Sequence, residues 1–196
     1  MLPLCERGVK TDEDPLIARL VAMSKEKKSL YRWESFAELK LSAKQLAAAE
    51  KYIKEVKDYR SYHLLFAVKN TSDEAYKRLP ADVKIMVLTS ALRELESLND
   101  WSRLHPDESS DGEAATALLQ LGKGAISHLA PILKISDPAK IFGSEESIAS
   151  SEYGYRRKDF AYRYISLILE KNPKFSADPK DRDKAIEVLI KHLSKP

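Results

Sequence analysis

The sequence has little of several residue types on which particular protein classes depend. One of its 196 residues is cysteine, Cys5, which excludes a disulfide scaffold, a CxxC redox pair and a cysteine-rich zinc site. Six glycines and nine prolines are too few for a collagen-like or low-complexity chain. The net charge of +3 is too small to indicate a nucleic-acid-binding protein. No apolar run approaches the roughly 20 residues that a membrane span needs.

The amino-terminal residues lack the apolar stretch of a secretory signal. No such stretch follows Met1, and we therefore predict a cytoplasmic protein. The first five residues, Met1 to Cys5, are loosely similar to the end of a lipoprotein signal. An exported protein whose signal is missing from this sequence is therefore the alternative.

The chain also lacks the short motifs that mark common enzymes. It contains no GxSxG, GxxxxGK[ST], GxGxxG or HExxH pattern. Its four histidines lie far apart and share no metal-ligand spacing. Two of them, His63 and His128, lie on apolar segments and are interpreted as core or groove residues. We therefore predict a protein that is not an enzyme, with no catalytic residues, no cofactor and no metal.

What the sequence does contain is helical periodicity. Hydrophobic residues make up 43% of the chain and charged residues 32%, which suits one globular domain with a buried core. Nearly every segment repeats its apolar residues with helical spacing, and none alternates like a half-buried strand. The predicted helices begin at or near Asp14, Leu30, Ser42, Tyr59, Ser72, Pro80, Asp111, Ala125, Glu152 and Asp181.

The pattern also predicts how these helices are organised. The most apolar helix, 81–98, is expected at the centre of the N-terminal half, because a helix that is apolar nearly all round is buried on several sides. A polar loop at 99–110 divides the domain into possible sub-units 14–98 and 111–194. Residues 136–151 show no periodicity and are predicted to form a long loop. A long helix is then expected over 152–171.

One segment carries a resemblance to a known family. Residues 112–133 read GEAATALLQLGKGAISHLAPIL, with a turn at Leu121-Gly122 between two apolar helices. This segment resembles one unit of a HEAT-type helical repeat. The resemblance implies an all-α fold built as an irregular stack of antiparallel helix pairs. A second segment, YRRKDFAY at 155–162, is similar to one in uncharacterised bacterial proteins and implies no function.

The segment 152–164 is the best candidate for a binding surface. It holds five aromatic and four basic residues, types that dominate protein interfaces. The candidate partner-binding residues are Tyr153, Tyr155, Arg156, Arg157 and Arg163. On a helix, Tyr155 and Tyr162 share one side and could form a solvent-facing patch with Arg156 and Arg163. Phe160 and Tyr164 lie along another side, which is interpreted as core.

The alternative for the same arginines is an intramolecular role, and the charge distribution favours it over binding. Residues 99–151 contain 4 basic and 8 acidic residues, whereas residues 152–196 contain 11 basic and 7 acidic residues. The arginines could therefore pair with acidic residues of the same chain.

These observations favour a non-enzymatic module that binds a protein or peptide, since stacked helix pairs present a concave face for such partners. An immunity or inhibitor-type protein is one alternative. A helical-repeat protein that binds nucleic acid is the other, and the low net charge counts against it.

Overall fold

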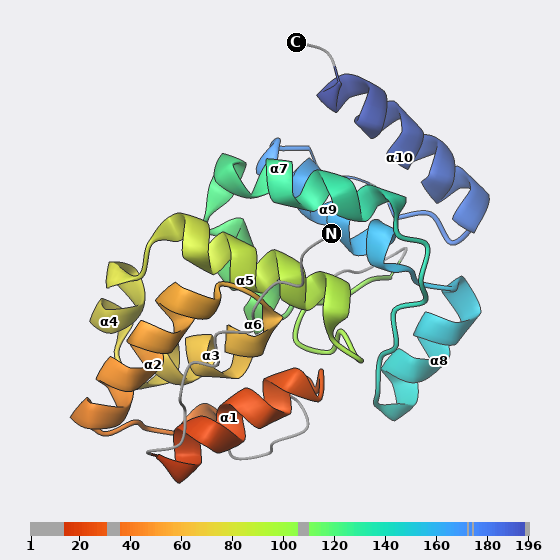
Figure 1. Cartoon of the computed structure of the whole chain (residues 1–196). Helices are drawn as coiled ribbons and strands as arrows, with labels where there is room; N and C mark the ends of the chain where they lie inside the picture. The colour runs from red at the N-terminus through yellow and green to blue at the C-terminus, as the bar shows by residue number, and fades with distance from the viewer. Residues whose placement is uncertain (1–13, 31–35, 106–109, 172, 174, 195–196) are drawn as a thin grey trace, which may run out of the picture.

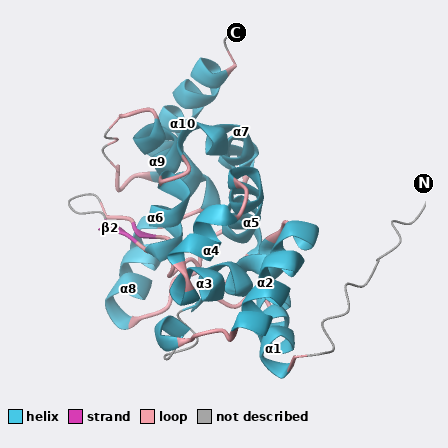
Figure 2. Cartoon of the chain, turned by 90° about the vertical axis from the view of Figure 1, so that its left-hand side faces the viewer, coloured by secondary structure: helices cyan, strands magenta, loops and turns pink. Residues whose placement is uncertain are grey.

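The computed structural model describes residues 14–30, 36–105, 110–171, 173 and 175–194. Within these residues the chain forms ten α-helices, short 3₁₀ segments and one two-stranded antiparallel sheet (Figures 1 and 2). The helices are α1 (Pro15–Lys25), α2 (Ala43–Val56), α3 (Tyr62–Thr71), α4 (Asp73–Arg78), α5 (Ala81–Glu94), α6 (Glu113–Leu119), α7 (Ile126–Leu129), α8 (Ser144–Tyr153), α9 (Arg157–Ile168) and α10 (Pro179–Leu193). The sheet pairs β1 (Ser102–Arg103) with β2 (Ser110–Asp111). The chain is thus mainly helical, as predicted, although the sequence predicts no strand.

Three predicted helix starts are confirmed because their signals are local. The Asp14 carboxylate accepts hydrogen bonds from two backbone N–H groups of the first turn of α1, and Pro15 occupies the first helical position. Ser42 and Gln45 form a complete capping box at the start of α2. The Ser72 hydroxyl accepts from the backbone of α4.

Helix α3, rather than α5, lies at the centre of the N-terminal half. Both α1 and α2 pack on α3, and residues 62–68 of this helix are fully buried. Helix α5 packs on α3 on one side and on α6 and α7 on the other. Figure 1 shows α5 crossing the molecule between these two groups. The expected position of α5 at the centre of the N-terminal half is therefore wrong. Its sequence is apolar because the helix is buried against both the N-terminal and the C-terminal half of the chain.

Helix α9 has the central position in the C-terminal half. Helices α6, α7 and α10 all pack against it. Its inner face is formed by Phe160, Ala161, Tyr164 and Ile165, none of which is exposed to solvent. Phe160 and Tyr164 are thus core residues, as predicted. One buried apolar cluster contains residues from both 14–98 and 111–194, so the two possible sub-units share a core.

Several predicted boundaries are wrong. Helix α8 occupies the second half of the predicted loop 136–151, and α9 begins at Arg157 rather than Glu152. Gly154, with φ 57°, ends α8 in the left-handed conformation and separates the two helices. The last helix begins at Pro179 with Asp178 as its N-cap, instead of at Asp181.

Two further predicted helices also differ from the structure. Helix α5 ends at Glu94, four residues before the expected Leu98. The predicted short helix at 30–39 lies partly outside the described residues, and within them Phe36–Glu38 forms a 3₁₀ turn.

The segment that resembles a HEAT unit is less regular than the resemblance implies. Helix α6 ends in a turn at Gly122, which has φ 63°. The expected second helix is divided into a 3₁₀ segment (Gly122–Ala125), the four-residue α7 and a second 3₁₀ segment (Ala130–Lys134). Pro131 lies at the start of that last segment, where a backbone N–H would have no acceptor within the segment, so its absence removes no hydrogen bond of that segment. The stacked HEAT-like arrangement stays a prediction.

None of the helices in the described part of the chain combines the length and apolarity that crossing a membrane requires. The lipoprotein-like start at Met1 to Cys5 lies outside the described residues.

Candidate functional site

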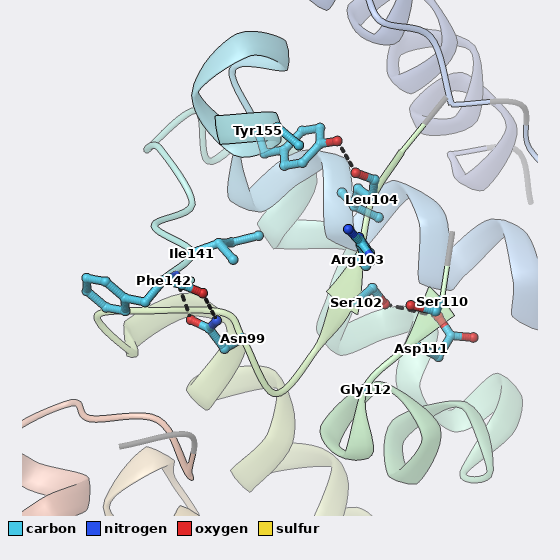
Figure 3. A pocket seen from close by; sticks show the side chains of 11 residues that line it. Asn99, Ser102, Arg103, Leu104, Ser110, Asp111, Gly112, Ile141, Phe142 and Tyr155 are labelled. Atoms are coloured by element: carbon cyan, nitrogen blue, oxygen red, sulfur yellow. Dashed lines mark hydrogen bonds between the residues drawn. The ribbon is translucent and has the colours of Figure 1, made fainter. Parts of the chain in front are cut away.

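Two neighbouring cavities lie where the β-hairpin, the segment after α7 and the helix α8 meet. The first has a volume of about 340 Å³, and Figure 3 shows the residues that surround it. Its lining residues are Asn99, Ser102, Arg103, Leu104, Ser110, Asp111, Gly112, Ile141, Phe142, Ala149 and Tyr155. The side chain of Ile141 points toward the hairpin, whereas the ring of Phe142 is turned away from it (Figure 3).

The second cavity has a volume of about 670 Å³ and continues on the α8 side. It shares Ile141, Phe142 and Tyr155 with the first, so the two cavities adjoin, and we call them together the α8 groove. Its other lining residues are Ser136, Pro138, Ala139, Lys140, Ser147, Ser150, Ser151, Gly154 and Arg156. The α8 groove thus combines an apolar strip with hydroxyl groups and the exposed Lys140.

The hairpin on one side of the groove is held by close backbone packing. Gly112 follows β2, and its N–H donates to the Trp101 carbonyl oxygen. A methyl group at Gly112 would lie 2.5 Å from the Asp100 carbonyl oxygen and 2.6 Å from that of Trp101. Only glycine permits this approach of two backbone segments.

A hydrogen-bonded chain ties the same hairpin to α9. The Ser102 hydroxyl donates to Asp111 Oδ1 at 3.0 Å and lies 3.0 Å from the Tyr164 hydroxyl. The Arg163 guanidinium donates to the same Asp111 oxygen, also at 3.0 Å. Burial raises the pKa of Tyr164 well above its ordinary value, so this phenol stays protonated and able to donate.

The segment that lines both cavities is fixed through its backbone. The side chain of Asn99 accepts from Phe142 N at 3.0 Å and donates to Phe142 O at 2.6 Å (Figure 3). Leu98 N donates to Lys140 O, and Ala139 N donates to Tyr155 O. The centre of the groove therefore has a defined shape.

Of the predicted site residues, Tyr155 lines both cavities, and Tyr153 packs on it from outside the groove lining. Tyr155 is buried, and its hydroxyl donates to the Leu104 carbonyl oxygen (Figure 3). Burial raises the pKa of Tyr155 to about 12. Tyr153 is half-buried and stacks on Tyr155 with a centroid separation of 5.9 Å. Tyr155 precedes α9 instead of lying on it, so its expected solvent-facing position is wrong.

Arg156 lines the second cavity but directs its charge inward. Its guanidinium forms ion pairs with Asp159 at 2.9 Å and with Asp183 of α10 at 2.9 Å. Burial acts to lower the pKa of Arg156, but these two carboxylates outweigh it and raise the pKa. Arg156 therefore connects the start of α9 to α10.

Arg157 is largely buried, and its charge points into the protein. Its guanidinium donates to the carbonyl oxygens of Leu92 and Leu95, both at 2.6 Å, at the C-terminal end of α5. A cation at this place satisfies carbonyl groups that a helix end leaves open. Burial lowers the pKa of Arg157 from its ordinary value, although it stays far above neutrality because guanidinium is so strong a base.

Arg163 is also buried, and its partner is Asp111. This pair joins residue 163 to the acidic stretch 99–151, as the alternative interpretation of the charge distribution predicts. The expectation that Arg163 faces solvent is therefore wrong. Of the five predicted binding residues, Tyr155 and Arg156 line the groove, whereas Arg157 and Arg163 hold the surrounding helices.

The charged residue that sequence reasoning missed is Arg182 of α10. Its side chain is 2% exposed and forms an ion pair with the fully buried Asp159 at 3.3 Å. It also donates to the carbonyl oxygens of Tyr153 and Gly154, at 2.6 and 3.0 Å. Arg182 thus fixes the turn between α8 and α9. Its only signal in the sequence is a place in a helix rich in charges, which does not distinguish it from exposed neighbours.

His63 is a core histidine, as predicted. It is fully buried in α3, and its Nδ1 lies 2.8 Å from the Ser24 hydroxyl of α1. Burial lowers the pKa of His63 to about 4, so the ring is neutral near pH 7. The prediction for His128 is wrong, since this side chain is exposed.

A third cavity, of about 390 Å³, lies between the segment after α7 and the end of α10. Its lining residues are Ser127, Ala130, Pro131, Leu133, Lys134, Ile190, Leu193 and Ser194. Across the described ranges, no three or more histidine, cysteine, aspartate or glutamate side chains are grouped so that they could hold a metal ion.

Comparison with known proteins adds no family to this description. No family model, no curated protein and no solved structure shows significant similarity to the chain. The HEAT-like resemblance accordingly stays a prediction. The feature of the structure that bears most directly on function is the geometry of the α8 groove.

Proposed function

We propose that the chain is a binding module, without catalytic activity, that holds a short peptide segment of a partner protein in the α8 groove. The observation that supports this most is that two cavities adjoin and share Ile141, Phe142 and Tyr155. Small molecules are usually enclosed in one deep pocket. Two shallow cavities side by side suit an elongated ligand that lies along the surface.

The lining of the groove suits a peptide better than a highly charged ligand. Leu104 and Ile141 form the apolar part of the lining, and both are largely buried. Ser147 and Ser151 supply hydroxyl groups that can bond a peptide backbone. Arg156 cannot provide a strong anion site, because its guanidinium is already bonded to Asp159 and Asp183.

A peptide library tests the proposal without knowledge of the natural partner. Purified full-length protein is panned against random peptides displayed on phage, and the enriched peptides are titrated by fluorescence anisotropy. We expect enriched peptides to bind at least about 10-fold more weakly to a Ser151→Arg variant, in which a long side chain fills the second cavity.

The matched control is Ser127→Arg, which makes the same exchange at an exposed serine beside the third cavity. We expect this variant to bind the peptides within about twofold of the unmodified chain, because surface changes away from a site have small effects. Equal binding by both variants, loss through Ser127→Arg alone, or failure to enrich any peptide would each overturn the proposal.

A further inference from the structure

Helix α8 is attached to the rest of the molecule far more loosely than any other helix. Within the described residues, every other helix packs against at least one neighbouring helix, whereas the contacts of α8 with other elements are sparse. Both views place α8 at the edge of the molecule (Figures 1 and 2). Of residues 147–153, Ser150 alone is buried, and the one branched apolar side chain, Ile148, is 67% exposed.

Both ends of α8 have backbone conformations that suit a hinge. Gly143 precedes the helix with φ 114°, and Gly154 follows it with φ 57°. Residues with a Cβ atom disfavour both of these positive φ values. Glycine has no Cβ atom, so it can rotate to other φ and ψ angles at little steric cost. Arg182 holds the carbonyl oxygens on the Gly154 side, so this end is the fixed pivot and the Gly143 end is the one that moves. A helix whose middle has little apolar burial can open about such a pivot without unfolding its neighbours.

The same helix forms a wall of both parts of the α8 groove. Ala149 lines the first cavity, and Ser147, Ser150 and Ser151 line the second. A movement of α8 therefore changes access to both cavities at once. From these observations we infer that α8 is a hinged lid over the groove, closed in this structure and opening as one unit.

One side-chain hydrogen bond, made by Ser150, holds this lid against the groove. The Ser150 hydroxyl donates to the Ala139 carbonyl oxygen at 3.1 Å, which joins α8 to the segment that lines the groove. The C-terminal end of α8 is held separately, by the stacking of Tyr153 on Tyr155 and by the hydrogen bonds of Arg182 to Tyr153 and Gly154. The Ser150 bond is the side-chain contact that holds the middle of the helix closed. A ligand that binds only the open form has its apparent affinity reduced by the fraction of molecules that are open.

Amide hydrogen exchange, measured by mass spectrometry on the full chain, tests the lid directly. We expect the amides of α8 to exchange at least about 100-fold faster than those of α9, because they open locally while α9 opens only with the core. Ser150→Ala should accelerate exchange in α8 a further ~5-fold and leave α9 unchanged, since a single hydrogen bond is lost. Ser151→Ala, the matched change at the exposed neighbouring serine, should alter neither helix.

Two results would overturn the inference. One is exchange of α8 and α9 at the same rate in the unmodified chain, which would show that α8 has no opening of its own. The other is an equal acceleration of both helices by Ser150→Ala, which would make Ser150 a determinant of global stability. The lid concerns the proposed binding groove, but the measurement uses no peptide. Failure of the lid and failure of peptide binding are therefore distinguished.

Discussion

Replacing Arg182 by methionine should cost about 4 kcal/mol of unfolding free energy. The guanidinium is 2% exposed, donates to four backbone carbonyl oxygens at 2.6 to 3.1 Å, and faces the buried Asp159. Breaking a buried ion pair from one side typically costs ~3–5 kcal/mol. Asp159 keeps Arg156 as a partner, so most of the expected loss comes from the four carbonyl oxygens that no longer have a charged donor. Methionine keeps most of the packing of the aliphatic stem, so the loss reports the charge and its hydrogen bonds.

Urea unfolding followed by far-ultraviolet circular dichroism measures this loss. With a typical dependence of about 2 kcal/mol per molar urea, the midpoint should fall by about 2 M. The control is Arg78→Met, which removes a side chain that is 62% exposed and pairs with Glu50 at 3.0 Å. Such surface pairs contribute at most about 1 kcal/mol. Equal midpoints for the two variants would refute the reasoning, and Arg182→Lys, with an intermediate loss expected, covers the case in which Arg182→Met does not fold.

Three further predictions concern the backbone contact, the buried histidine and the helix cap. Gly112→Ala should destabilise the chain by about 2–4 kcal/mol in the same urea assay, since its methyl group would meet two backbone oxygens, whereas Gly124→Ala, which meets a side-chain methyl group at 3.2 Å, should cost under about 1 kcal/mol. The folded-state pKa of His63 is about 4 and the ordinary value is 6.5, so between these values the unfolded state binds a proton that the native state does not. The free energy of unfolding should therefore fall as the pH drops from 6.5 to 4. In His63→Gln this fall should be smaller by about 3 kcal/mol. An identical pH dependence of the two proteins would contradict the prediction. Arg157→Met should cost about 2–3 kcal/mol and speed hydrogen exchange in the last turn of α5, whereas unchanged exchange there would show that the cap does not hold this helix end.

The features that the sequence predicts well are those with causes a few residues apart. Asp14 and Ser42 bond to backbone groups two or three residues along the chain, so the helix starts can be read directly. Asp111 resembles such a cap equally well, but its carboxylate binds Arg163, which lies 52 residues further along the chain. The two cases differ only in a partner that no local pattern reveals.

Helix α8 was beyond pattern-based prediction for a related reason. An amphipathic pattern exists because one face of a helix is buried against a core. In the part of α8 whose burial is described, residues 147–153, Ser150 alone is buried, and the sequence SEESIASSEY shows no apolar periodicity. The cavities of the groove are equally invisible in the sequence, because they arise between a hairpin, an extended segment and this helix.

The candidate binding residues show what composition can and cannot predict. The segment 152–164 is rich in aromatic and basic residues, and the groove does lie beside it. The composition could not show that Arg157 and Arg163 are buried, because an arginine with backbone or aspartate partners in the core looks the same in the sequence as one in an interface.

The contact between Arg157 and the end of α5 has a consequence for the order in which the chain folds. The carbonyl groups that this arginine caps lie 62 and 65 residues earlier in the chain. During synthesis, the last turn of α5 therefore lacks its cap until residue 157 has left the ribosome and α9 has docked. The N-terminal half does not reach its final form as an independent early unit, and the late-made helix completes the early-made one.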